Sequence, residues 1–208
     1  MIELRNINKS FGDKILFKDF NIKIGEGESV AIIGRSGSGK STLLNIISLI
    51  EAPDSGEVLW NEKACKVNSK NSESIIRNEI AYLFQNYALI DNEDVYHNVL
   101  VACKYNKKIK DKKEAIGGAL KEVGLNGMEN RKIFSLSGGE QQRIALARVL
   151  VKPCSVIFAD EPTGNLDDEN SDKVMDILFD LNHKGKTIIV VTHDNRYLNR
   201  FNRIIKID

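Results

Sequence analysis

The sequence predicts a single-domain α/β fold whose core is a parallel β-sheet with helices on both faces. Apolar runs of strand length alternate with segments of helical periodicity, which is the pattern of parallel sheets with crossover helices. The chain has 208 residues, of which 42% are hydrophobic. That is enough for one domain with a sizeable core and too little for two ordinary domains.

The first half of the chain opens with strands. Residues 2–8 and 20–24 alternate between apolar and polar side chains, which predicts half-buried strands at a sheet edge. The continuous apolar run at 29–34 predicts a strand covered on both faces, and helical spacing follows at 41–50. After a turn, the run at 56–60 returns to strand.

The second half alternates helices with buried strands. Past a short apolar run at 81–84, residues 72–135 are polar with helical spacing, which predicts a helical insert. The remaining expected elements are helices near 140–151 and 170–182 and strands at 155–160, 187–192 and 203–207.

Charge, hydropathy and cysteine spacing exclude several classes of protein. The 30 basic and 29 acidic residues leave a net charge of +1, so no overall positive field attracts nucleic acid, and we expect no nucleic-acid partner. No apolar run approaches the roughly 18 to 20 residues that span a bilayer. Glu3 and Arg5 stand where a secretory signal would be apolar, so we expect a cytoplasmic protein. Three widely spaced cysteines predict reduced thiols rather than a disulfide framework or a zinc site.

A glycine-rich loop follows the strand expected at 29–34. Its sequence, GRSGSGKS, fits the pattern G-x-x-x-x-G-K-[ST] and lies between a predicted strand and a predicted helix, as a phosphate-binding loop requires. The glycines let backbone N–H groups surround phosphate oxygens, and the helix N-terminus adds its positive dipole end. Lys40 is expected to reach the β- and γ-phosphates, and Ser41 to ligate Mg²⁺. The alternative is a chance glycine-rich turn, which average residue frequencies make rare.

Two adjacent carboxylates, Asp160 and Glu161, end another buried strand. This placement suits a nucleotide enzyme, in which one acid supports the Mg²⁺ shell and the next activates the attacking water. A solvated acidic turn is the alternative. We favour the site because a phosphate loop belongs to the same sheet.

His193 directly follows the last buried strand in VVTHD. Ligands of parallel α/β sheets bind beyond the carboxyl ends of the strands, so Gly34, Asp160 and His193 should meet at one edge. There His193 would hydrogen-bond a γ-phosphate. We expect His97 and His183 to be ordinary surface or hydrogen-bonded residues.

A second glycine motif, LSGGE, precedes the helix expected near 140–151. Ser137 with Glu140 three residues later predicts a capping box. The cap does not explain Gly138 and Gly139, each of which destabilises a helix by about 1 kcal/mol relative to alanine. Bare N–H groups at a helix N-terminus bind anions, so the motif is a second potential phosphate site.

Taken in order, these motifs resemble the ATP-binding subunit of an ATP-binding cassette (ABC) transporter over essentially the whole chain. The order is GRSGSGKST, Gln85 in LFQN, LSGGEQQR, VIFADEP, GNLD and VVTHD. The resemblance implies one ABC ATP-binding domain: a P-loop NTPase core with a parallel sheet, an N-terminal antiparallel β subdomain and an inserted helical subdomain. The core would cover about 1–85 and 152–208, and the helical subdomain about 86–151. The resemblance also implies a head-to-tail homodimer, with ATP between the phosphate loop of one subunit and LSGGE of the other.

The same resemblance implies a role for each matching residue. Glu161 would be the general base, His193 the γ-phosphate contact, and Gln85 part of the Mg²⁺ and water shell, giving Ser41, Gln85 and Asp160 as metal residues. Asn165 and Asp167 would line the dimer seam. The expected ATP-binding residues are Phe11, Gly34, Arg35, Ser36, Gly37, Ser38, Gly39, Lys40, Ser41 and Thr42 from one subunit, with Ser137, Gly138, Gly139 and Asp167 at the same interface.

Phe11 falls where the family usually places a tyrosine that stacks on adenine. Phenylalanine keeps the π-face and loses only the hydroxyl, so stacking should survive. The alternative is that Phe11 is an ordinary core residue, as aromatic residues near strand ends usually are.

The expected function is an ATP-hydrolysing subunit that powers export or release through a separate membrane permease, bound to the inner face of the membrane by that permease. EPTGNLD is similar to subunits of lipoprotein-release, macrolide-efflux and peptide-antibiotic permeases, and FQNYALIDNEDVYHNV resembles bacteriocin exporters. The chain ends at Asp208 without the C-terminal domain of many sugar importers, which makes sugar import a weaker expectation.

Two other functions stay open at this point. One is an ABC ATPase that acts on ribosomes or DNA without a permease, although the near-neutral charge offers no electrostatic footprint for nucleic acid. The other is a small-molecule kinase or GTPase with the same phosphate loop, which would leave LSGGE and VVTHD unexplained.

Overall fold

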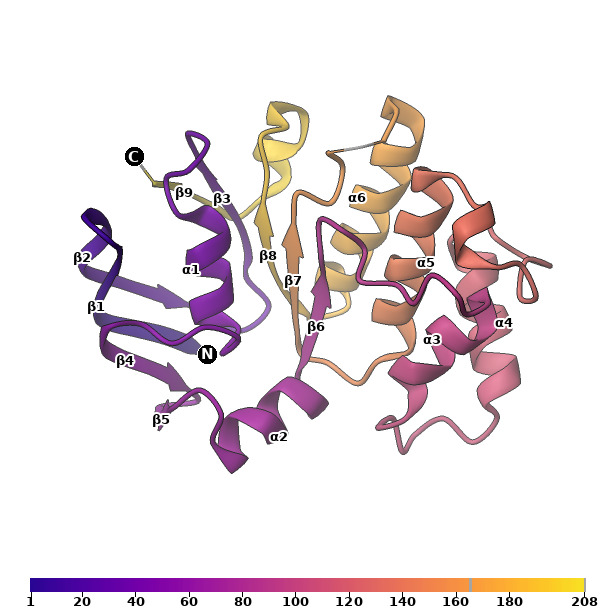
Figure 1. Ribbon diagram of the computed structural model, residues 1–208, viewed down its shortest axis with the longest axis horizontal. Helices are drawn as coiled ribbons and strands as arrows, with labels where there is room; N and C mark the ends of the chain where they lie inside the picture. The colour runs from indigo at the N-terminus through magenta and orange to yellow at the C-terminus, as the bar shows by residue number, and fades with distance from the viewer. Residues whose placement is uncertain (165, 208) are drawn as a thin grey trace.

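A computed structural model describes residues 1–164 and 166–207. Its central feature is a five-stranded parallel sheet in the order β6-β7-β8-β3-β9 (Figure 1), which confirms the predicted α/β class. The strands are β3 (Ser29–Gly34), β6 (Ile80–Leu83), β7 (Val156–Asp160), β8 (Thr187–Val191) and β9 (Arg203–Ile207).

A second, antiparallel sheet has the order β2-β1-β4-β5. Its strands are β1 (Ile2–Phe11), β2 (Lys14–Ile24), β4 (Ser55–Trp60) and β5 (Lys63–Cys65). The expectation that both N-terminal strands lie at a sheet edge is wrong for β1, which pairs with β2 on one side and β4 on the other. Alternation reports one buried face, and it does not report whether the strand has one neighbour or two.

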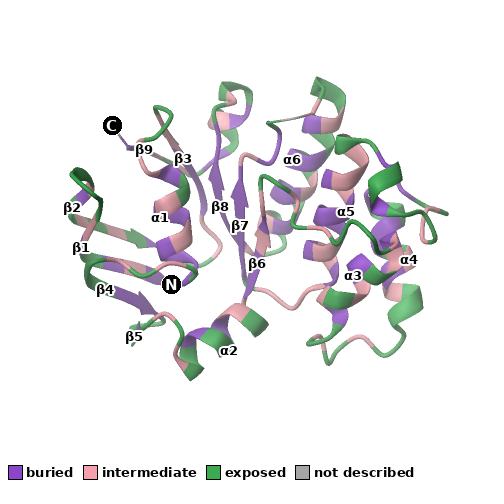
Figure 2. Ribbon diagram, in the orientation of Figure 1, coloured by how far each residue is buried: buried purple, intermediate pink, exposed green. Residues whose placement is uncertain are grey.

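The parallel sheet is covered on both faces, as predicted, and its central strands β7 and β8 are buried throughout (Figure 2), whereas the edge strand β9 is partly exposed. Val30 and Ile32 pack into a cluster with α1 (Lys40–Ile47) and the antiparallel sheet, whereas Ala31 points into a cluster on the opposite face. That opposite face carries α5 (Gly138–Val151) and α6 (Asp168–His183).

The expected helix at 41–50 ends earlier, at Ile47. Leu49 adopts a left-handed φ of 63°, and the amide N–H of Ile50 returns to the carbonyl oxygen of Asn45 at 2.9 Å. The apolar spacing continues past the end of the helix because Leu49 is still buried in the turn.

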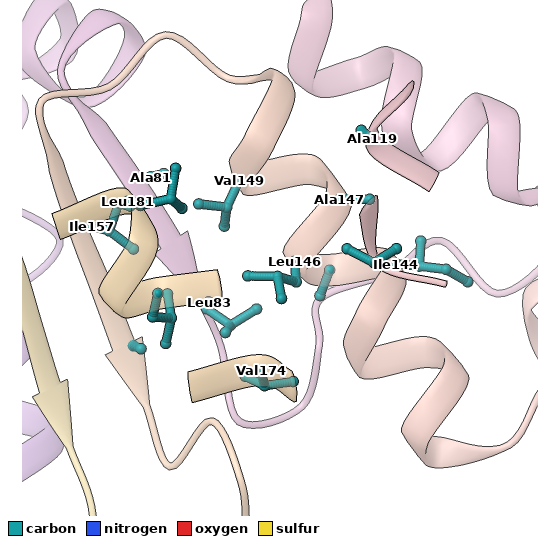
Figure 3. Close-up of a cluster of buried hydrophobic side chains, with 14 of the residues drawn as sticks. Ala81, Leu83, Ala119, Ile144, Leu146, Ala147, Val149, Ile157, Val174 and Leu181 are labelled. Atoms are coloured by element: carbon teal, nitrogen blue, oxygen red, sulfur yellow. The ribbon is translucent and has the colours of Figure 1, made fainter. Parts of the chain in front are cut away.

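Helices and the loops that join them make up residues 86–151. Figure 3 shows Leu146 of α5 near Leu83 and Val149 of α5 near Ala81 of the parallel sheet, and Ile144 belongs to the same cluster. The same apolar cluster therefore runs from the sheet into the helices, and the subdomain boundaries stay a prediction. The remaining elements are α2 (Lys70–Asn78), α3 (Val95–Cys103), α4 (Lys112–Glu122) and the short 3₁₀ helices η1 (Ile133–Ser135) and η2 (Asn195–Arg200).

Among the described residues, no helix has both the length and the apolar character needed to cross a membrane. The three cysteines are free thiols, as expected.

Candidate active site

The carboxyl ends of β3, β7 and β8 open into one cleft, as expected for ligand sites in parallel sheets. Its volume is about 630 Å³. The cleft is lined by Phe11, Lys14, Leu16, Ser36, Gly37, Gly39, Lys40, Ser41, Thr42, Gln85, Glu161, Gly164 and His193. Five segments of the chain thus meet at one edge of the sheet.

The phosphate loop is shaped by close backbone approaches. Gly39, which precedes α1, has a φ of 98°, and a Cβ there would lie 3.0 Å from the Phe17 ring. At Gly34 a Cβ would overlap the carbonyl oxygen of Ile207 in β9. Glycine is therefore required at both positions, and the loop delivers its N–H groups to the start of α1.

Lys40 is 7% exposed and is the first residue of α1, at the end of this loop. Its ammonium group donates to the carbonyl oxygens of Gly34 at 3.0 Å and Arg35 at 2.9 Å. The positive charge is thereby held against the backbone of the phosphate loop.

Asp160 ends β7 beside the loop and is 9% exposed. Burial raises the pKa of its carboxyl group, while the Ser41 hydroxyl and Lys40 oppose that shift. Among the described residues, its Oδ1 atom is buried with no hydrogen-bond partner. A buried carboxylate oxygen without a donor is costly, so this oxygen is suited to accept a ligand.

Glu161 is fixed in an unusual backbone conformation, with a φ of 48°. Its amide donates to the carbonyl oxygen of Val191 in β8 at 2.9 Å. The carboxylate faces His193, whose Nε2 lies 3.1 Å from Oε1 and whose backbone N–H lies 3.3 Å from Oε2. Burial raises the pKa of Glu161, and His193 opposes the shift. A carboxylate with a raised pKa is a stronger base toward a water proton.

Phe11 is 54% exposed at the end of β1 and lines the cleft, so the alternative that it is a core residue is wrong. The Lys9 ammonium lies 5.1 Å from its ring centroid. An exposed aromatic face at the rim can stack on a nucleobase.

Sequence reasoning missed Lys14, which begins β2 and lines the same cleft. Its ammonium donates to the Gly37 carbonyl oxygen at 2.8 Å, tying the hairpin to the phosphate loop. A lysine in a hairpin has no local pattern that marks such a contact.

The LSGGE segment lies outside this cleft. The capping box is confirmed: Ser137 Oγ accepts from the Glu140 amide at 3.3 Å, and Glu140 Oε2 accepts from the Ser137 amide at 2.7 Å. Gly138 and Gly139 form the first turn of α5, as expected. Asp167 caps α6 by accepting from the Asn170 amide at 2.8 Å, and Asn165 lies outside the described residues. The structure thus gathers one group of expected residues in the cleft and leaves Ser137, Gly138, Gly139 and Asp167 apart from it.

The burial of Asp160 should make the stability of the protein depend on pH. Its pKa is higher in the folded than in the unfolded chain, so the native state binds more protons and the protein loses stability as pH rises through the folded pKa. Asp160→Asn should therefore raise the Tm of the nucleotide-free protein at neutral pH, by about 2–4 °C per kcal/mol of relief. Differential scanning fluorimetry checks this, with the exposed Asp180→Asn as a control. The gain should shrink in acid, and an unchanged or lower Tm at neutral pH would contradict the argument.

Comparisons with known proteins show the family of the chain. A family model described as "ABC transporter" matches residues 17–164. An uncharacterized ABC transporter ATP-binding protein of Methanocaldococcus jannaschii is 41% identical, covering 100% of this chain and 95% of that protein. Lipoprotein-releasing system ATP-binding protein LolD of Aquifex aeolicus is 41% identical, covering 93% and 88%. Macrolide export ATP-binding/permease protein MacB of Chlorobaculum tepidum is 40% identical over 99% of this chain, which spans about a third (32%) of that relative.

One solved structure is a dimeric ATP-binding cassette in a post-hydrolysis state, bound to ADP and Pi. It has a TM-score of 0.91 and 36% identity to this chain, and the match covers 100% of this chain and 94% of that one.

Proposed function

This chain belongs to the ABC transporter family as an ATP-binding subunit, and from that premise we propose which of its residues act on ATP and which partners it requires. The protein binds and hydrolyses ATP, and the hydrolysis is coupled to transport. The observation that carries the assignment of residues is the cleft itself, where the phosphate loop, Glu161 and His193 share one sheet edge.

In the proposed reaction, the triphosphate lies along the phosphate loop with Lys40 at its β- and γ-oxygens. Glu161 accepts a proton from the water that attacks the γ-phosphorus, and the bond to the leaving ADP oxygen breaks as the new P–O bond forms. His193 contacts the transferred phosphoryl group. Its hydrogen bond to Glu161 also orients the base, since the two side chains already touch at 3.1 Å.

The residues around Asp160 fit a hard cation. Its buried, unpartnered Oδ1 is an oxygen ligand of the kind that Mg²⁺ prefers, and Ser41 and Gln85 bring further oxygens to the same cleft. We propose that these three side chains hold Mg²⁺ with the nucleotide, either directly or through water. A Mg²⁺ ion held there would supply positive charge that offsets the negative charge of the phosphates.

A homodimer follows from the two separate glycine motifs. Ser137, Gly138 and Gly139 present a capped helix N-terminus that does not reach the subunit's own cleft. We propose that they bind the phosphates held by a second copy, with Asp167 at the seam, as in a head-to-tail pair. The dimeric relative supports this arrangement.

The second proposed partner is a membrane permease in another chain, which would hold the subunit at the inner face of the membrane. Relatives named for lipoprotein release and for macrolide export support the export or release branch. The likeness to bacteriocin exporters stays a prediction. These relatives do not favour the alternative of a ribosome- or DNA-acting ATPase.

Phe11 should contribute to nucleotide affinity by stacking on the adenine. Phe11→Ala is expected to weaken ATP binding by roughly 1–3 kcal/mol, the usual worth of an aromatic–base contact, whereas Phe11→Tyr should keep it. Isothermal titration calorimetry measures both, with Ile15→Ala, an exposed neighbour in β2, as a matched control. Equal affinity of Phe11→Ala and the parent would exclude stacking.

Two measurements test the proposed function as a whole. Phosphate release from ATP, with no acceptor added, separates a hydrolase from a kinase. Sedimentation with membranes only when a neighbouring permease is co-expressed separates a transporter subunit from a free ATPase. Absence of hydrolysis by the purified protein and its complex, or co-purification with RNA or DNA, would contradict the proposal.

A further inference from the structure

Helix α5 contacts the turn at Glu161 and Pro162 of its own subunit through the side chain of Gln142. This residue lies one turn into the helix that begins with Gly138 and is 2% exposed. Its Nε2 donates to the carbonyl oxygen of Pro162 at 2.7 Å, and Pro162 directly follows Glu161. The helix with the second glycine motif therefore contacts the peptide next to the proposed base.

The Glu161–Pro162 turn is a backbone that needs outside support. A non-glycine residue at a φ of 48° is disfavoured by about 1–2 kcal/mol, and the following proline restricts it further. Such a conformation persists only where its surroundings hold it. The Glu161 amide is held by Val191, and its carbonyl oxygen accepts from the Gly164 amide at 3.1 Å. The next carbonyl oxygen along the chain, that of Pro162, accepts a hydrogen bond from Gln142.

The Gln142 amide is only half satisfied. Its Oε1 is buried without a hydrogen-bond partner among the residues described. Burying an unpaired acceptor is unfavourable, and an apolar side chain of similar size would avoid it. The Gln142 side chain therefore makes its hydrogen bond through Nε2, which donates to the Pro162 carbonyl oxygen. The helix itself is immobilised, because Ile144 and Leu146 next to Gln142 are fully buried in the core.

We propose that Gln142 is a positioning residue: it fixes the turn that carries Glu161 to the same rigid helix that offers Ser137, Gly138 and Gly139 to the partner's nucleotide. Each subunit would in this way place the base of its own site in register with its contribution to the other site. The inference rests on the proposed function, since it takes Glu161 as the base. Gln142 touches no substrate and acts only through the loop.

The test is Gln142→Met, which keeps the volume and removes the donor. A loosened turn should lower kcat about 10- to 100-fold, the effect of a small misplacement of a catalytic group, with little change in KM. The matched control is Asn106→Leu, which removes an amide bond to the Val151 carbonyl oxygen at the other end of α5.

Each possible result either supports or excludes the positioning role of Gln142. Parent values of both kcat and KM in Gln142→Met would overturn it, while leaving the ATPase assignment intact because the parent still hydrolyses ATP. A parent that does not hydrolyse ATP would refute the proposed function instead. If Gln142→Met does not fold, Gln142→Leu takes its place, and failure of both to fold would show a structural role and overturn positioning.

Discussion

Replacing Glu161 by glutamine is expected to reduce kcat for ATP hydrolysis about 10³-fold while leaving ATP binding intact. A positioned general base contributes roughly 10²- to 10⁴-fold to a rate, and the amide of glutamine cannot accept the proton. Glutamine has nearly the same shape as glutamate, so the contact with the His193 backbone N–H can be kept by its carbonyl oxygen. Phosphate-release kinetics measure the loss.

The same variant should accumulate as an ATP-bound dimer. When hydrolysis is blocked, the subunits have no step that separates them, so size-exclusion chromatography with ATP should show a dimer that the parent forms only transiently. Glu169→Gln, at an exposed glutamate in the first turn of α6, is the control. Hydrolysis by Glu161→Gln at the parent rate would refute Glu161 as the base.

Lys40→Met should weaken ATP binding about 10- to 100-fold. Hydrogen bonds to charged groups contribute about 1.5–3 kcal/mol each, and the substitution removes the only lysine of the loop 34–41. Calorimetry in the Glu161→Gln background gives the affinity without turnover.

A second substitution separates charge from shape. Lys40→Arg keeps the positive charge but places a larger planar group in a position that is 7% exposed, so it should not restore affinity. The exposed Lys184→Met controls for loss of charge alone. An unchanged affinity of Lys40→Met would remove this residue from the phosphate site.

The site could be predicted from the sequence because its signals are local. A continuous apolar run marks a strand whose carboxyl end is a site in parallel sheets, and the run at 29–34 has the bounds of β3. The capping box of Ser137 likewise needs only residues three apart. Features made by distant segments left no such mark. The left-handed φ of Glu161, its pairing with His193 and the Gln142–Pro162 bond depend on how β7, β8 and α5 meet.

The bonds from Lys40 to the Gly34 and Arg35 carbonyl oxygens hold the loop in shape through contacts within the chain. When ATP binds, the Lys40 ammonium group exchanges these two carbonyl oxygens for phosphate oxygens. Few residues of the loop then have to become ordered. Nucleotide entry and departure should accordingly be governed by diffusion and by separation of the two subunits, and a slow refolding phase of the loop should be absent from stopped-flow binding traces.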